Sequence, residues 1–172
     1  MRSIEECRIR AGRLKLMIFD VDGVLTDGSL YFTDEGTEIK VFNARDGHGL
    51  RMLQAEGVTL AIITGRDAPC VGWRMKNLGI EHVHQGIGDK LATFHELLAK
   101  LGVKAEEAGF MGDDVIDLQV MAACGFSATP SDGHEINRQR ADYRAGCPGG
   151  RGAVREVCEF ILAARQNQGT EA

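Results

Sequence analysis

Two aspartates directly follow a short apolar run near the start of the chain. The run covers residues 17–19, and Asp20 and Asp22 stand beyond it, just before Gly23. An unbroken apolar run of this length is typical of a strand buried on both faces of a parallel sheet, and open α/β sheets bind ligands at the carboxyl ends of their strands. Two carboxylates held so close repel each other, which favours a bound cation or a raised pKa in one of them. Hard cations such as Mg²⁺ take oxygen ligands of this kind, so the pair predicts a metal site.

Two later apolar runs, Thr59–Ile63 and Ala108–Met111, also end in polar residues. The groups beyond them are Thr64 and Gly65 in one case and Asp113 and Asp114 in the other, and Lys90 opens a connection between the two runs. Because the ends of parallel strands converge, we expect these groups to share one pocket. Carboxylates for a cation, with a hydroxyl, backbone N–H groups and an ammonium for an anion, suit phosphoryl transfer.

Each acid can be given a role in that chemistry. Asp20 directly ends the strand, so we expect it to be the nucleophile that forms an aspartyl-phosphate. Asp22 is expected to protonate the leaving oxygen and later to activate the hydrolytic water. A Mg²⁺ ion that bridges Asp20, Asp113 and a phosphate oxygen would remove the repulsion that weakens an anionic nucleophile.

The rest of the chain alternates strand-like and helix-like stretches, which predicts a doubly wound, mostly parallel α/β sheet. We expect one domain over residues 1–172, with a β-hairpin insert at about 29–42 and a C-terminal tail at about 149–172. Besides the three apolar runs above, strands are expected at 82–84, 126–128 and 142–143. Helices are expected at 4–14, 50–54, 68–78, from a cap at Asp89, 115–123, from near 132, and 153–164.

The hairpin insert is too long for an ordinary connection between a strand and a helix. Two β-rich runs flank a turn at residues 34–36, and the arm they form would expose a strip of four apolar side chains. These are Leu30, Phe32, Ile39 and Val41. We therefore expect the arm to cover the site or to mediate assembly with other subunits.

Composition narrows the class of protein. The net charge of −5 does not suit a general nucleic-acid binder, and no apolar run approaches the length that crosses a membrane. The five cysteines are far apart and form no C-x-x-C pair, and the charged N-terminus lacks the apolar centre of a signal peptide. These features predict a protein of a reducing cytoplasm, with neither nucleic acid nor membrane as partner.

Four motifs resemble, in order, those of the haloacid dehalogenase superfamily phosphatases. They are Asp20-x-Asp22-Gly-Val-Leu-Thr, Thr64-Gly-Arg66, Lys90 and Gly112-Asp-Asp114-x-x-Asp117. The hairpin, the segment 42–51 and the Gly-Gly-Arg-Gly tail at 149–158 resemble, more narrowly, the capless 3-deoxy-D-manno-octulosonate 8-phosphate phosphatases. The chain departs from that pattern at His48 and at residues 132–135.

The resemblance implies a Mg²⁺-dependent phosphatase of lipopolysaccharide precursor synthesis, which acts on that sugar acid phosphate. It implies that Asp20, Asp22 through its carbonyl, and Asp113 hold the metal, and that Thr64, Gly65 and Lys90 hold the phosphate. It also implies a homotetramer in which the hairpins form a barrel and neighbouring subunits help to close each site. The residues that match the substrate contacts are Asp22, Asn43, Ala44, Arg45, Asp46, Gly47, Arg51, Arg66, Arg74 and Lys90, and Arg151 follows two glycines as a mobile contact.

Several interpretations stay open from the sequence. The substrate can instead be a nine-carbon sugar acid phosphate, and a non-catalytic receiver-like module would also combine clustered acids with a Thr and a Lys. Asp114 and Asp117 can cap the helix that follows them or tune the metal. The tail can close over its own active site or over a neighbour's.

Overall fold

Six short parallel strands form the sheet that carries the acids, in a computed structural model that describes residues 3–169. Residues 1–2 lie outside the described residues, as do residues 170–172 at the end of the predicted C-terminal tail. The sheet order is β5-β4-β1-β6-β7-β8. The strands are β1 (Leu16–Phe19), β4 (Thr59–Ile63), β5 (His82–His84), β6 (Ala108–Met111), β7 (Phe126–Thr129) and β8 (Tyr143–Arg144).

This order confirms the predicted doubly wound sheet. The chain moves outward from β1 through β4 to β5, returns to the other side of β1 as β6, and then moves outward again through β7 to β8. The connections after β1 and β6 therefore leave in opposite directions, which opens a crevice at the carboxyl ends of these two strands. Asp20 and Asp113 both lie there.

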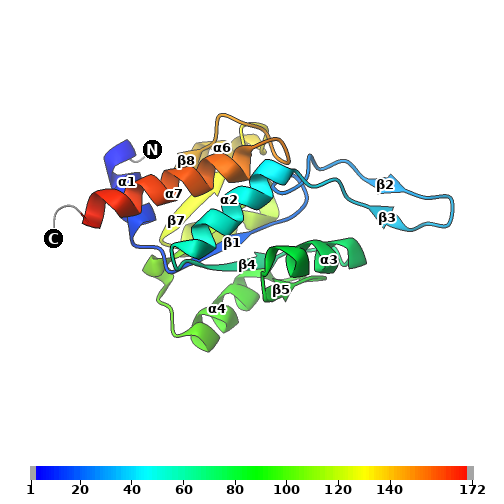
Figure 1. The fold of residues 1–172 in the computed structure, drawn as a ribbon, viewed down its shortest axis with the longest axis horizontal. Coiled ribbons are helices and arrows are strands. Elements are labelled where there is room, and N and C mark those ends of the chain that lie inside the picture. The colour runs from blue at the N-terminus through cyan, green and yellow to red at the C-terminus, as the bar shows by residue number, and fades with distance from the viewer. Residues whose placement is uncertain (1–2, 170–172) are drawn as a thin grey trace.

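Helices cover both faces of the sheet (Figure 1). They are α1 (Ile4–Gly12), α2 (Ala44–Ala55), α3 (Pro69–Leu78), α4 (Lys90–Leu101), α5 (Leu118–Ala123), α6 (Glu135–Arg140) and α7 (Ala153–Gly169), with 3₁₀ turns η1 (Ala105–Glu107) and η2 (Val115–Asp117). Alternate β1 side chains enter different cores: Met17 and Phe19 pack with α1, α2, α3 and α7, whereas Leu16 and Ile18 pack with α4 and α5. None of the helices described here is long and apolar enough to cross a membrane.

The predicted hairpin is present as β2 (Tyr31–Phe32) and β3 (Glu38–Ile39), which pair antiparallel and extend away from the sheet (Figure 1). Its strands are shorter than the two runs in the sequence suggested. All four predicted apolar side chains are exposed, from 47% at Ile39 to 61% at Val41.

Several helix boundaries differ from the predicted ones. Helix α2 begins at Ala44 rather than at residue 50, because the Asn43 side chain accepts a hydrogen bond from the Arg45 N–H and starts the helix early. The helix predicted at 115–123 opens with the η2 turn, α6 begins at Glu135 rather than near 132, and α7 continues to Gly169.

Candidate active site

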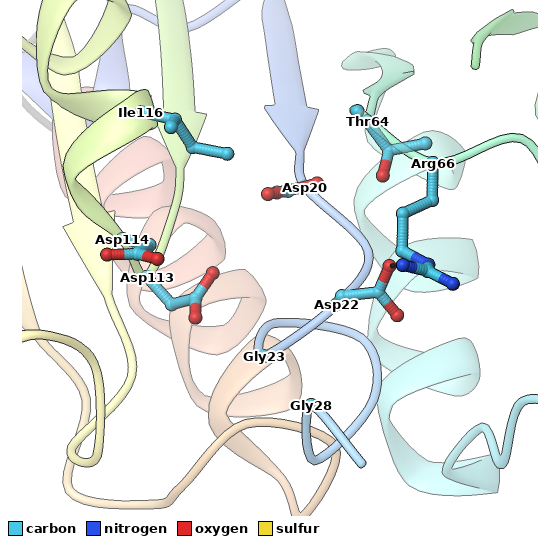
Figure 2. A pocket seen from close by; sticks show the side chains of 10 residues that line it. Asp20, Asp22, Gly23, Gly28, Thr64, Arg66, Asp113, Asp114 and Ile116 are labelled. Carbon is cyan, nitrogen blue, oxygen red and sulfur yellow. Dashed lines mark ion pairs between the residues drawn. The ribbon is translucent and has the colours of Figure 1, made fainter. Parts of the chain in front are cut away.

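A cavity of about 230 Å³ opens at the carboxyl ends of β1, β4 and β6. Figure 2 shows Asp20 between two groups of side chains, with Thr64 and Arg66 on one side and Asp113 and Asp114 on the other. The lining residues are Asp20, Asp22, Gly23, Gly28, Thr64, Gly65, Arg66, Asp113, Asp114 and Ile116. The structure thus brings together the strand-end residues that the sequence singled out.

Asp20 is held on all sides where it leaves β1. Its N–H donates to the Met111 carbonyl at 3.0 Å, one carboxylate oxygen accepts from the Val21 N–H at 2.7 Å, and the other accepts from Lys90 Nζ at 2.5 Å. Burial raises the pKa of Asp20 to about 6, and the charge of Asp117 adds to the effect while Lys90 opposes it. Hydrogen bonds thus fix the position of the Asp20 carboxylate, while burial and the charge of Asp117 disfavour its ionised form.

Three carboxylates at this end of the sheet fit a divalent cation. Asp20, Asp113 and Asp117 each offer an oxygen, and these oxygens lie within 4.8 Å of one another. Burial, together with repulsion by Asp20, Asp117 and Asp114, raises the pKa of Asp113 to about 8. A hard cation among these oxygens would remove the repulsion that raises both pKa values, so the donor set suits Mg²⁺.

Gly23 is the residue that lets Asp113 approach the loop after β1. Its backbone has a φ of +80°, and a Cβ there would lie 2.1 Å from Asp113 Oδ2. A side chain at this position would therefore displace one of the predicted metal ligands as well as strain the turn.

Lys90 and Asp117 form a buried pair behind Asp20. The Lys90 ammonium lies 2.7 Å from Asp117 Oδ1, and burial lowers its pKa less than the two carboxylates raise it. The other Asp117 oxygen accepts the N–H groups of Asp113 and Asp114 at 3.0 and 3.2 Å. Asp114 is the N-cap of the η2 turn, and Asp117 completes its capping box while also joining the acidic cluster. The sequence had left capping and metal tuning as alternatives for both residues.

Thr64 and Gly65 end β4 opposite the acids. The Thr64 N–H donates to the His84 carbonyl at 3.0 Å, so the group that Thr64 offers to a ligand is its hydroxyl. Beside Gly65, a Cβ would meet nothing closer than the Ile87 carbonyl at 3.7 Å. The chain is thus not tightly packed around Gly65, which lines the cavity beside Thr64.

Asp22 belongs to an ion-pair network that the sequence did not reveal. Its Oδ1 accepts a hydrogen bond from Lys40 Nζ, and Lys40 also donates to Glu38 at 2.7 Å. Arg66 donates twice to Glu38, at 3.2 Å each, and its Nε lies 4.0 Å from Asp22 Oδ2. No motif distinguishes Lys40 from other lysines in the sequence, because its partner Asp22 lies 18 residues away.

Most of the predicted substrate contacts lie outside the cavity lining. Asp22 and Arg66 line it, and Lys90 lies next to it through its bond to Asp20. The residues outside the lining are Asn43, Ala44, Arg45, Asp46, Gly47, Arg51, Arg74 and Arg151.

Asp46 makes structural contacts at the start of α7. It is 1% exposed, and its carboxylate accepts the Arg155 and Gly152 N–H groups at 2.8 and 3.2 Å at the start of α7. Asp46 therefore caps this helix and ties α2 to it. The neighbouring Gly47 is also a packing position, since a Cβ there would lie 2.2 Å from Arg74 Nη2.

Arg51 and Arg74, two of the predicted substrate contacts, bind to groups of their own chain near α3. Arg51 donates to the Asn77 carbonyl at 2.7 Å. Arg74 lies over the Phe42 ring at 6.0 Å and reaches the Asn43 carbonyl at 3.5 Å. Neither arginine lines the cavity of its own chain.

The tail glycines pack against the loop that follows β1. The Gly150 N–H donates to the Val24 carbonyl at 2.9 Å, and a Cβ on Gly149 would lie 1.8 Å from the Gly23 carbonyl oxygen. The sequence suggested that Arg151 follows flexible glycines, but these glycines are closely packed. Arg151 is itself exposed and pairs with Asp27 at 3.2 Å.

Comparison with known proteins places the chain among sugar acid phosphatases, although no protein-family model matches it. It is 47% identical over 156 residues to the 3-deoxy-D-manno-octulosonate 8-phosphate phosphatase KdsC of Yersinia pestis. The matched residues cover 91% of this chain and 83% of that relative. A solved structure of the Moraxella catarrhalis phosphatase, in complex with magnesium, phosphate and KDO, has a TM-score of 0.93 at 43% identity, with 98% and 97% of the two chains covered. A haloacid dehalogenase superfamily (subfamily III A) hydrolase from Legionella pneumophila has a TM-score of 0.93 at 38% identity, with 96% and 91% covered.

The fold and the site define a hydrolase of the haloacid dehalogenase superfamily, with paired aspartates after β1 and an acidic cluster after β6. This confirms the resemblance seen in the motifs. At 47% identity over most of both chains, the protein belongs to the 3-deoxy-D-manno-octulosonate 8-phosphate phosphatase (KdsC) family.

Proposed function

We propose that this protein hydrolyses 3-deoxy-D-manno-octulosonate 8-phosphate to the free sugar acid and phosphate, a step of lipopolysaccharide precursor synthesis. One observation carries the proposal: the nucleophilic carboxylate, the acidic cluster and the phosphate-binding groups meet in one cavity of a chain that is 47% identical to KdsC. Receiver-like binding modules are set aside because the chain belongs to a phosphatase family and because Asp22 supplies an acid/base beside the nucleophile.

The metal site is part of this proposal. Asp20 and Asp113 with the Asp22 carbonyl would hold Mg²⁺, and Asp117 stands close enough to orient them or to join them. When bound, the ion neutralises the carboxylates and the phosphoryl oxygens that approach them.

The side chains of the site divide the reaction between them. A carboxylate oxygen of Asp20 attacks phosphorus, and the bond from phosphorus to the sugar oxygen breaks as that oxygen takes a proton from Asp22. Asp22 then removes a proton from the water that attacks the aspartyl-phosphate, so both acids return to their starting states. Lys90, the Thr64 hydroxyl and the Gly65 N–H bind the phosphoryl oxygens and hold the group in line with Asp20.

An assay with the sugar acid phosphate tests the function. We expect turnover that EDTA abolishes and Mg²⁺ restores, and we expect Asp20→Asn to lower kcat by at least about 1,000-fold, because an amide cannot serve as the nucleophile. Asp34→Asn, at the exposed turn of the hairpin, is the matched control and should keep full activity. Turnover that persists in EDTA, or in Asp20→Asn, would contradict the mechanism.

A nine-carbon sugar acid phosphate is the alternative substrate. Assayed side by side, the eight-carbon ester should have the higher kcat/KM. The opposite order would keep the mechanism and change the substrate.

We also propose a homotetramer assembled through the hairpins, supported by the exposed apolar side chains of that arm. In such an assembly, neighbouring subunits help to close each site, which gives residues outside the cavity, such as Arg74, a route to a bound substrate. All five cysteines are free thiols, which supports a reducing, cytoplasmic location. Both cores share one sheet, so we take the chain as a single domain.

A further inference from the structure

Lys40 is a buried lysine at the base of the hairpin. It lies just after β3, its side chain is 1% exposed, and its ammonium is bonded to Asp22 Oδ1 and to Glu38. Burial lowers the pKa of Lys40, but the hydrogen bonds to the two carboxylates outweigh burial and hold that pKa above its ordinary value. The ammonium of Lys40 is therefore held directly against the residue to which we assign proton transfer.

The network treats the two oxygens of Asp22 differently. Lys40 binds Oδ1, whereas Oδ2 is a buried oxygen with no hydrogen-bond partner within residues 3–169. Arg66 Nε lies 4.0 Å from Oδ2, beyond hydrogen-bond distance, and Arg66 is engaged with Glu38. Of the two carboxylate oxygens of Asp22, Oδ2 is thus the one whose hydrogen-bonding capacity the described chain leaves unused.

Lys40 also restricts how Asp22 can turn. The buried ammonium of Lys40 has two anionic partners, Asp22 and Glu38. If the Asp22 carboxylate rotated away, the ammonium would lose one of them, which is costly where water cannot replace the lost bond. The charges balance as they stand, with Lys40 and Arg66 against Asp22 and Glu38. The contact therefore favours a single orientation of Asp22.

We propose that Lys40 is a positioning residue that holds the Asp22 carboxylate by one oxygen and so presents the other to the leaving oxygen of the substrate. The inference rests on the proposed function, in which Asp22 delivers that proton. Lys40 does not line the cavity, so it acts through Asp22 and does not itself bind the phosphate.

The leaving group of the substrate separates this role from a structural one. A sugar oxygen leaves as a poor anion and needs the proton of Asp22, whereas p-nitrophenolate leaves readily without one. The ratio kcat/KM reports the steps up to the first irreversible one, here the release of the alcohol and formation of the aspartyl-phosphate. Misplacing Asp22 should therefore lower kcat/KM for the sugar acid phosphate far more than for p-nitrophenyl phosphate.

The experiment measures both esters on the intact protein with Mg²⁺. We expect Lys40→Met to lower kcat/KM by about 10- to 100-fold on the sugar acid phosphate and by less than about 3-fold on p-nitrophenyl phosphate. Lys40→Arg, which keeps the cation, should recover much of the difference. Glu38→Gln keeps the bond from Lys40 to Asp22 and should leave the ratio between the two esters unchanged. Lys15→Met, which removes an exposed ion pair with Glu107, should change neither value.

A double variant completes the test. If Lys40 acts only through Asp22, Lys40→Met combined with Asp22→Asn should lose no more on the sugar acid phosphate than Asp22→Asn alone. Light scattering and thermal unfolding of each variant show that assembly and folding are retained, and Lys40→Arg carries the test if Lys40→Met does not fold. Equal losses on the two esters, or additive losses in the double variant, would overturn the role of Lys40 alone. A wild type inactive on the sugar acid phosphate would overturn the proposed function and this inference with it.

Discussion

At the scale of single residues, the site gathers more carboxylates than cations at the carboxyl end of the sheet. Asp20 and Asp113 have pKa values raised to about 6 and about 8, in each case first by burial and then by neighbouring carboxylates. Lys90 is the buried cation that opposes both shifts. Because of this surplus of carboxylates, we expect the free energy of unfolding to depend both on pH and on bound Mg²⁺.

The pH dependence has a definite sign. A carboxyl group with a raised pKa binds more protons in the folded state than in the unfolded one, from about pH 4 up to its folded pKa. The free energy of unfolding of the metal-free protein should therefore fall as pH rises from about 4 to about 8, and Mg²⁺ should recover more of it at pH 8 than at pH 6. Melting temperatures with Mg²⁺ and with EDTA at the two pH values measure this. The prediction fails if the gain is the same at both, or if Asp113→Asn keeps it.

The site residues that could be predicted from the sequence are those that directly follow a strand. Asp20, Thr64 and Asp113 each follow an apolar run, and the convergence of parallel strand ends is a general property, so their meeting was predictable. Lys40 and Asp46 were different, because their contacts cross 18 and more than 100 residues of chain. No local pattern encodes where the hairpin base or the start of α7 will lie.

At the scale of elements, periodicity predicted which stretches are strands and helices but not where local capping begins them. The run at Thr59–Ile63 and the helix ended by Gly79 agree with the structure, since buried strands and left-handed glycine caps have strong local signals. Helix α2 instead starts at Ala44, inside a segment whose glycines and charges read as a loop. There the Asn43 cap and packing against α7 outweigh the weak helix propensity of Gly47 and Gly49.

The cap that Asp46 places on α7 gives a prediction about stability. Asp46→Ala removes two hydrogen bonds to N–H groups at the start of the helix, so the free energy of unfolding should fall by about 1–2 kcal/mol. Urea denaturation measures the loss, and Asp34→Ala on the exposed hairpin turn should stay within about 0.5 kcal/mol of wild type. We expect little change in KM. A large rise in KM at unchanged stability would instead support the substrate-contact role that the sequence suggested for Asp46.

At the scale of the whole molecule, the hairpin is an arm whose base is tied to the body by ion pairs of Lys40 with Asp22 and of Glu38 with Arg66. It projects away from the sheet (Figure 1), each of its strands has two residues, and an isolated two-stranded hairpin is only marginally stable in water. The side chains of β2 and β3 belong to neither hydrophobic core of the described chain. The exposed apolar residues of the arm support the proposed assembly through the hairpins.

Assembly through this arm can be tested without disturbing the body. Phe32 and Ile39 are 56% and 47% exposed, so replacing both with lysine should leave the melting temperature of the body nearly unchanged. Like charges brought together in a barrel of hairpins would repel, and light scattering should show the mass of one chain where the wild type shows four. Ile4→Lys is the matched control, because Ile4 is an equally exposed apolar residue (54%) on α1, at the end of the molecule away from the hairpin, and it should leave the tetramer intact. A tetramer that survives both lysines would mean that another surface holds the subunits together.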